Sequence, residues 1–121
     1  MGPGGRALIE RGSVVVVDLD PTLGHEQRGM RPCVVVSDPE VVAAQRYPLL
    51  AIVPVTGRAG EGALYPALAA GASGLRQPSW ALADQVRSVD KRRVQRLVGQ
   101  VSEAESAVID QALALYLGLA S

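Results

Sequence analysis

The sequence of 121 residues contains one cysteine, one histidine, one tryptophan and no phenylalanine. Because Cys33 is alone, the chain cannot form an internal disulfide, and a zinc site built from several cysteines is excluded. Because His25 is alone, a pair of histidines for acid–base catalysis and the HExxH zinc motif are excluded as well. Aromatic residues make up 3% of the chain, which argues against a platform of aromatic rings that stacks nucleic-acid bases.

Long hydrophobic runs and a targeting segment are also missing. No apolar run approaches the roughly 20 residues that cross a membrane, and the start of the chain, MGPGGR, contains no apolar signal segment. We therefore expect no membrane association and a cytoplasmic location. The length of 121 residues is typical of one domain. Glycine and proline near the start predict a flexible leader over residues 1–10, followed by a single domain over residues 11–121.

The charges balance, with 12 basic and 12 acidic residues and no net charge. The overall charge therefore gives no reason to expect a polyanionic partner. The distribution is uneven, because residues 76–96 hold six basic and two acidic side chains, a local excess of four positive charges. Eleven of the 12 cationic residues are arginine, which favours bidentate contacts to phosphate or carboxylate. A GC-rich genome would produce the same bias.

Short apolar runs separated by glycine and proline predict a protein made mainly of β-strands. The expected strands cover residues 13–19, 33–37, 49–56, 63–68, 79–83, 85–89 and 94–101, and the fifth and sixth of these could be one bent strand. Residues 39–46 predict one or two helical turns, and a capping box at Ser102 and Glu105 begins a C-terminal helix. We therefore predict a mainly β (α+β) fold: a small, strongly curved antiparallel sheet or barrel with a short internal helix and a C-terminal helix.

Polar residues at strand ends are the remaining candidates for chemistry. Residues 22–31 form a loop longer than a hairpin needs, which is typical of a functional loop. Arg31 precedes Pro32, whose ring favours an extended backbone at Arg31, and Thr56 ends an expected strand. If these strand ends are neighbours, the arginine and the hydroxyl can hold a phosphate and stabilise developing negative charge. A solvated arginine at a strand end is the simpler alternative.

The sequence contains no P-loop and no GxGxxG motif after a strand. Asp18 and Asp20 would share a strand face and could hold a magnesium ion. No third carboxylate approaches them in the sequence, so solvated carboxylates at a strand end are the simpler interpretation. We therefore predict neither a metal site nor a cofactor.

Residues 24–37, GHEQRGMRPCVVVS, resemble the GxEQxGxRPxxVxS signature of the MazF/PemK toxin family. Further matches follow in the order of the family: Arg11-Gly12, VDLDP at residues 17–21, VPVT at residues 53–56 and ALADQVRSVD at residues 81–90. The resemblance covers about residues 11–119.

This resemblance implies an SH3-like barrel with added helices, acting as a homodimer with RNA grooves at the subunit interface. It also implies a metal-independent endoribonuclease, the toxin of a toxin–antitoxin pair, which cuts single-stranded mRNA at a short sequence and blocks translation. A cognate antitoxin protein would neutralise it. By the same resemblance Arg31 and Thr56 are the catalytic residues, and the substrate-binding residues are Glu26, Gln27, Ser79 and Gln85.

The expected reaction is an in-line attack of the ribose 2′-hydroxyl on the adjacent phosphate, which gives a 2′,3′-cyclic phosphate and a 5′-hydroxyl. Arg31 is a poor general base because an arginine pKa is above about 12. His25 stands where relatives often have serine, and with an ordinary pKa of about 6.5 it is a candidate base or substrate contact. A solvated loop histidine is the simpler interpretation.

Two alternatives keep the fold without the reaction: a non-catalytic binding module such as a gyrase-poisoning toxin, and a degenerate homologue. The matches at Arg31 and Thr56, and the absence of a C-terminal tryptophan, argue against the first. The second stays open at this point. The basic cluster of Lys91, Arg92, Arg93 and Arg96 would extend an RNA path, dock an acidic antitoxin segment, or form a solvated basic turn.

Overall fold

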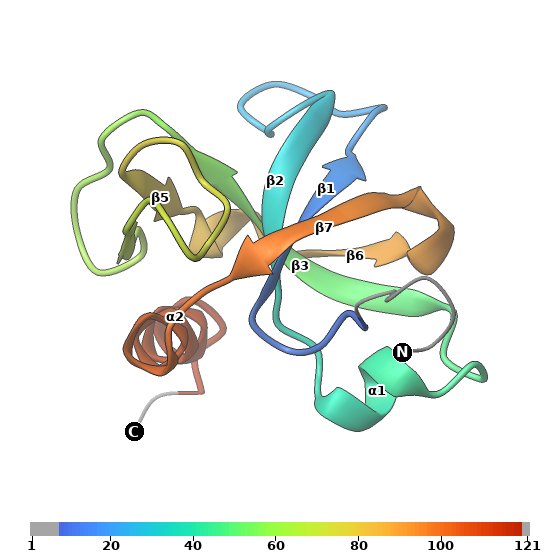
Figure 1. Cartoon of the computed structure of the whole chain (residues 1–121). Helices are drawn as coiled ribbons and strands as arrows, with labels where there is room; N and C mark the ends of the chain where they lie inside the picture. The colour runs from blue at the N-terminus through green and yellow to red at the C-terminus, as the bar shows by residue number, and fades with distance from the viewer. Residues whose placement is uncertain (1–7, 120–121) are drawn as a thin grey trace.

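The computed structural model describes residues 8–119 (Figure 1). Its elements, in chain order, are β1 Ser13–Asp18, β2 Met30–Val35, α1 Pro39–Ala43, β3 Leu49–Thr56, β4 Ala67–Leu68, β5 Ser79–Ala81, the 3₁₀ turn η2 Ala83–Gln85, β6 Arg87–Asp90, the 3₁₀ turn η3 Lys91–Arg93, β7 Val94–Gln100 and α2 Glu103–Tyr116. Strands dominate, and the longer helix closes the chain, as the sequence predicts.

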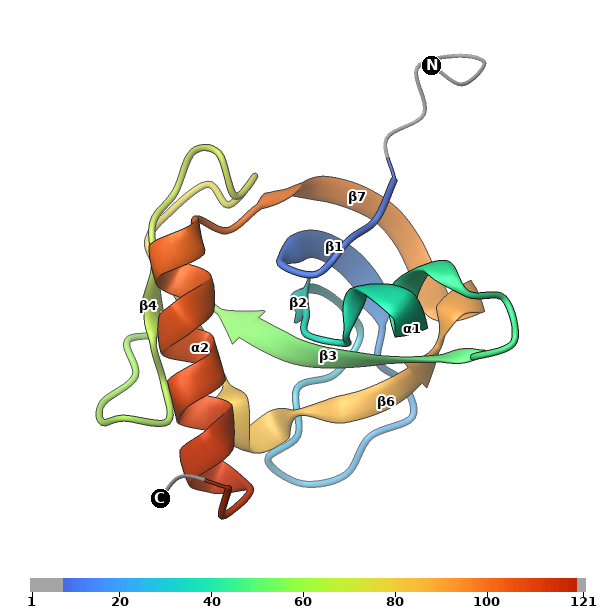
Figure 2. The same cartoon turned by 90° about the horizontal axis from the view of Figure 1, so that it is seen from below.

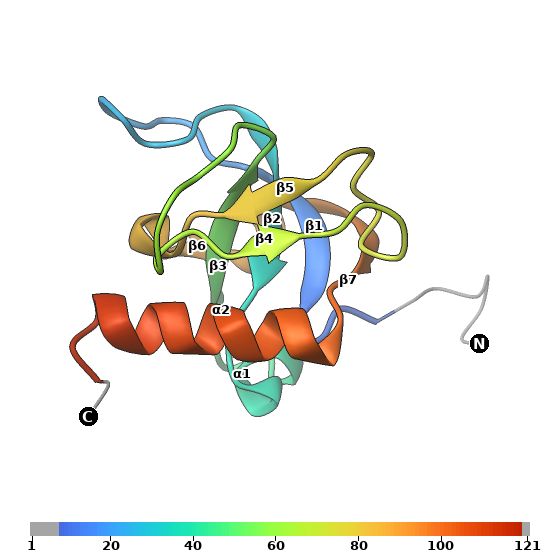
Figure 3. The ribbon, with the colours of Figure 1, turned by 90° about the vertical axis from the view of Figure 1, so that its left-hand side faces the viewer.

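The strands form one antiparallel sheet in the order β4-β5-β3-β2-β1-β7, and β6 pairs with β3 outside this path. The sheet curves so strongly that β7, β1, β2, β3 and β6 surround a common interior (Figure 2). Helix α2 lies beside β4 and β5, outside that interior (Figure 3). The prediction of a mainly β, antiparallel barrel-like fold with a C-terminal helix is confirmed.

The valine-rich strands are buried on both faces, which explains why their sequences lack polar alternation. Successive side chains of a strand point to opposite faces. Val15 and Val17 of β1 pack into a cluster with Leu19, Cys33, Val35 and Ile52 inside the barrel. Val14 instead joins Val34, Val53, Val55 and Ile109 in a second cluster that includes α2. The curved sheet therefore separates two cores.

Helix α2 is fixed at its start and along its buried side. The Ser102 hydroxyl accepts the Glu105 N–H at 3.0 Å and the Glu105 carboxylate accepts the Ser102 N–H at 2.9 Å, which confirms the predicted capping box. The other carboxylate oxygen of Glu105 accepts the Ala69 N–H at 2.7 Å. Ile109 and Ala112 are buried under the helix. The helix is therefore attached both to the sheet and to the loop after β4.

The structure changes three strand boundaries. β2 begins at Met30 instead of residue 33, because its first residues pair with the end of β1. β4 covers only Ala67–Leu68 of the expected residues 63–68. The segment that could have been one bent strand is two strands, β5 and β6, which pair with opposite ends of β3 and are separated by the turn η2. This turn lets one chain segment follow a strongly curved neighbour.

Residues 1–7 of the predicted leader lie outside the described residues. Of the leader residues that are described, Ile9 packs against the barrel interior cluster. Between residues 8 and 119, no helix has both the length and the apolar composition that spanning a membrane requires.

Candidate active site

The pairing of β2 with β3 brings Arg31 and Thr56 together. Cys33 lies opposite Pro54 at the end of this antiparallel pair. Arg31 lies two residues before Cys33 and Thr56 two residues after Pro54, so both lie just beyond the last paired residues at the same end of the pair. Because side chains two residues apart in a strand project to the same face, Arg31 is on the side of Cys33 and Thr56 on the side of Pro54. Both side chains line one open hollow of about 480 Å³ at the end of the barrel. The ends of these two strands are therefore neighbours, as the sequence-based prediction of a phosphate site requires.

The Arg31 guanidinium is oriented by the loop that precedes it. Its Nε donates to the carbonyl oxygen of Arg28 at 3.0 Å. Among residues 8–119, no carboxylate forms an ion pair with Arg31. A guanidinium has five N–H donors in a planar fork, so the remaining donors are available to a phosphate that enters the hollow.

The Thr56 hydroxyl is positioned by the turn that follows β3. Its oxygen accepts the Arg58 N–H at 3.2 Å, which leaves the hydroxyl proton available for donation. Gly57 and Gln77 line the next part of this hollow. The two are in close contact, since a Cβ atom at Gly57 would lie 2.2 Å from the side-chain nitrogen of Gln77. The glycine therefore allows the Gln77 amide to close this side of the hollow.

Two further hollows continue from the first and share residues with it. One, of about 420 Å³, is lined by Gln27, Thr56, Arg58, Tyr65, Leu82 and Gln85 among others. The other, of about 140 Å³, is lined by Glu26, Gln27, Pro54, Asp84, Gln85, Val86 and Arg87. Gln27 lines all three. We call this series of hollows the groove.

Another hollow, of about 540 Å³, lies elsewhere, between α1, β3 and β7. Its lining is apolar apart from Lys91, whose ammonium group donates to the carbonyl oxygens of Val41 and Ala44. It lacks the paired polar groups of the groove, and we do not assign it to the reaction.

The structure separates the predicted substrate-binding residues into two groups. Glu26, Gln27 and Gln85 line the groove. Ser79 does not: its side chain is buried and its hydroxyl donates to the Gln77 carbonyl oxygen at 3.0 Å. The exposed His25 offers its backbone oxygen to the Gln85 amide at 3.3 Å and is not among the groove-lining residues.

Several groove residues were not predicted. The Tyr65 hydroxyl donates a hydrogen bond to Asp84 Oδ2 at 2.7 Å. This hydrogen bond is the main reason why the pKa of Tyr65 is raised, and partial burial raises it by a smaller amount. Asp84 Oδ1 is buried without a hydrogen-bond partner among the described residues. Asp84 stands within the ALADQVRSVD match, which could have marked it, whereas nothing in the local sequence distinguishes Gln77 or Arg58.

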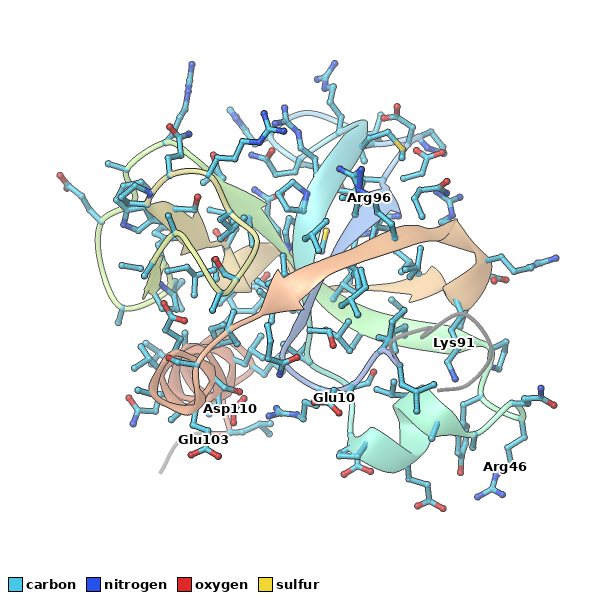
Figure 4. All side chains as sticks on the ribbon, in the orientation of Figure 1. Glu10, Arg46, Lys91, Arg96, Glu103 and Asp110 are labelled. Carbon is cyan, nitrogen blue, oxygen red and sulfur yellow. The ribbon has the colours of Figure 1, made fainter. Side chains whose placement is uncertain are left out.

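Most of the basic cluster has structural partners. Lys91 binds the last carbonyl groups of α1, Arg92 forms an ion pair with Asp90 at 2.9 Å, and Arg93 donates to the carbonyl oxygen of Asp18 at 3.2 Å. Arg96 projects from β7, apart from Lys91 near α1 (Figure 4). The ion pair holds the pKa of Asp90 down at about 2. These contacts favour a structural basic turn over a phosphate path for the cluster as a whole.

Comparison with known proteins identifies the family. Residues 10–117 match the family of PemK-like, MazF-like toxins of type II toxin–antitoxin systems. The chain belongs to this family. The prediction from the motif in residues 24–37 is therefore confirmed.

Relatives of this MazF-like chain agree over almost its full length. It is 40% identical to endoribonuclease MazF9 of Mycobacterium tuberculosis, with 93% of this chain and 98% of the relative covered. It is 28% identical to the solved MazF of Deinococcus radiodurans, at a TM-score of 0.77 and with 93% and 99% of the two chains covered. A MazE–MazF structure from the same organism gives 28% identity and a TM-score of 0.73, with 95% and 100% covered. At the level of the family, the prediction of a toxin endoribonuclease is confirmed.

Proposed function

We propose that this MazF-like toxin cuts single-stranded RNA, mRNA in the cell, at a short sequence and without a metal ion. The observation that carries the proposal is that Arg31 and Thr56 line one open hollow, which continues into the rest of the groove. Family membership supports the choice of RNA as the polymer, since the relative from Mycobacterium tuberculosis is named an endoribonuclease.

In the proposed reaction the 2′-hydroxyl oxygen attacks the neighbouring phosphorus as the bond from phosphorus to the 5′-oxygen breaks. The attacking hydroxyl loses its proton and the leaving oxygen takes one up, which yields a 2′,3′-cyclic phosphate and a 5′-hydroxyl. Arg31 neutralises the charge that accumulates on the phosphate oxygens, and Thr56 donates its hydroxyl proton to one of them. Fixed donors of this kind act without a metal.

The proposal includes two protein partners. MazE–MazF structures exist for the Deinococcus radiodurans toxin, and we propose that an antitoxin likewise blocks this chain. We also propose a homodimer, because Val108 and Leu115 of α2, and Leu117 and Leu119 just after it, are between 46% and 74% exposed, and a twofold partner would cover such a surface. A monomeric mass by light scattering would contradict the dimer. The cytoplasm, where mRNA is translated, is the proposed location.

The test is cleavage of a long RNA of mixed sequence by the purified protein in excess EDTA, with both product ends mapped. We expect discrete cuts that carry 2′,3′-cyclic phosphates. Arg31→Ala should lower the rate by about 10² or more, since it removes the charge opposite the reacting phosphate. Arg46→Ala is the matched control, because Arg46 is exposed and pairs with Glu40 near α1. A folded wild-type protein that leaves the RNA intact would support the non-catalytic alternative.

A further inference from the structure

The loop between β1 and β2, residues 19–29, carries Gln27 and leads into Arg31. It lies at the end of the barrel away from α1 (Figure 1). Two arginines hold its first end: Arg87 donates to the Leu19 carbonyl oxygen at 3.1 Å, and Arg93 donates to the carbonyl oxygens of Asp18 and Asp20. The Asp20 carboxylate accepts the Gly29 N–H at 3.0 Å and closes the base of the loop.

Within the middle of this loop the Glu26 carboxylate accepts the Leu23 N–H at 2.7 Å, and from outside the loop the Gln85 side chain binds its backbone. Gln85 Oε1 accepts the Gln27 N–H at 2.7 Å, and Gln85 Nε2 donates to the His25 carbonyl oxygen at 3.3 Å. Gln85 ends the turn η2, whose first residue, Ala83, is fully buried. The amide is therefore fixed to a rigid turn on one side and bound to the loop backbone on the other.

The hydrogen bond between Gln85 and Gln27 is linked to Arg31 through one intervening residue, Arg28. Arg28 follows Gln27 directly, and its carbonyl oxygen is the acceptor that orients the Arg31 guanidinium. A loop that moves at Gln27 also moves this acceptor. Displacements of about 1 Å in a positioning group can lower a rate by about 10².

We propose that Gln85 is a positioning residue for RNA cleavage, which acts by clamping residues 25–27 so that Gln27 lines the groove and Arg31 faces Thr56. This rests on the proposed function. It differs from the role that the family resemblance implies for Gln85, a direct substrate contact. The two roles differ because both polar atoms of the Gln85 side chain already form hydrogen bonds with the loop backbone.

Trypsin provides a test that does not depend on RNA cleavage. Arg28 is the one site in the loop that trypsin can cut, because the bond after Arg31 precedes proline. We expect Gln85→Ala to raise the rate of cleavage after Arg28 by about tenfold, as the loss of the clamp frees the loop. Cleavage after the exposed Arg58, measured in the same digest, is the internal reference.

The kinetic readout separates positioning from binding. Gln85→Ala should lower kcat by at least about tenfold with little change in KM. Gln85→Glu keeps an oxygen for the Gln27 N–H but loses the donor to His25, so it should restore part of both kcat and trypsin resistance. Gln45→Ala is the matched control, since Gln45 is exposed beside α1 and away from the groove.

A raised KM with unchanged kcat and unchanged cleavage after Arg28 would overturn the proposal and return Gln85 to direct contact with RNA. Wild-type protein that does not cut RNA would contradict the proposed function, and the digest alone would then decide whether Gln85 clamps the loop. Faster cleavage after Arg28 and Arg58 alike would mean general loosening, which also overturns the proposal.

Discussion

Arg31 and Thr56 lie just beyond Cys33 and Pro54, the last residues that pair β2 with β3, and both line the same hollow. The register that produces this arrangement is fixed by the buried residues of the same strands. A shift of one residue would turn Cys33 and Val35 out of the barrel interior. The packing of the core therefore also determines the geometry of the site.

The Thr56 hydroxyl is expected to contribute to the reaction and not to the fold. Thr56→Val keeps the branched shape but removes the donor, and should lower the single-turnover rate of RNA cleavage by about 10². Thr56→Ser keeps the hydroxyl and should retain most of the rate. Activity of Thr56→Val within about twofold of wild type would exclude the assigned role. Urea unfolding of both variants provides the control for stability.

Docking of α2 depends on Ile109. This side chain is 1% exposed and packs in the cluster that joins α2 to the sheet. Ile109→Ala should lower the free energy of unfolding by about 2–5 kcal/mol, because it leaves a cavity between helix and sheet. Val108→Ala, on the neighbouring position that is 46% exposed, should cost well under about 1 kcal/mol. Equal losses for the two variants in urea unfolding would contradict this packing.

Glu105 makes stability depend on pH. Partial burial alone would raise the pKa of Glu105. The hydrogen bonds from the Ala69 and Ser102 N–H groups lower it by a larger amount in total, so the net pKa lies below the ordinary 4.5. A carboxylate with a lowered pKa stabilises the fold above its unfolded pKa, and this contribution is lost as the pH falls through the folded pKa. We expect a loss of roughly 0.5 kcal/mol, because the group is only partly buried and is screened by solvent.

The measurement compares urea unfolding of wild type and Glu105→Gln at pH 7 and at pH 3. The variant should be less stable at pH 7 and close to wild type at pH 3. Glu103→Gln, two residues earlier on α2, is the control and should leave the wild-type pH dependence in place. An unchanged pH dependence in Glu105→Gln would argue that its two backbone contacts do not persist in solution.

Cys33 should be inert in the native protein. Burial raises the pKa of its thiol to about 12, with a smaller opposing effect from the charge of Arg87. The thiol is therefore protonated and inaccessible at pH 8, whereas the thiolate is the reactive form. Reaction with Ellman's reagent should be negligible until urea unfolds the chain, and should then reach one thiol per chain. Prompt full reaction of the folded protein would refute the burial of Cys33.

The sequence by itself determined the strands, the capped C-terminal helix and the family, because each of them follows from a pattern of residues close together in the chain. Runs of valine, the Ser102 to Glu105 capping box and the motif around Arg31 need no information from distant residues. That motif singled out Arg31, and the VPVT match at residues 53–56 singled out Thr56. Strand ends were less certain: β2 begins earlier and β4 is shorter than predicted, since pairing with a neighbour decides where a strand ends.

Only the tertiary structure decided which polar groups meet. The pairing of β2 with β3 brought Arg31 and Thr56 to one hollow, and the turn η2 brought the Gln85 amide to the backbone of residues 25–27. It also buried Ser79, which the resemblance had assigned to substrate. These outcomes depend on contacts between residues far apart in the chain, and such contacts are fixed by the packing of the two cores around the curved sheet.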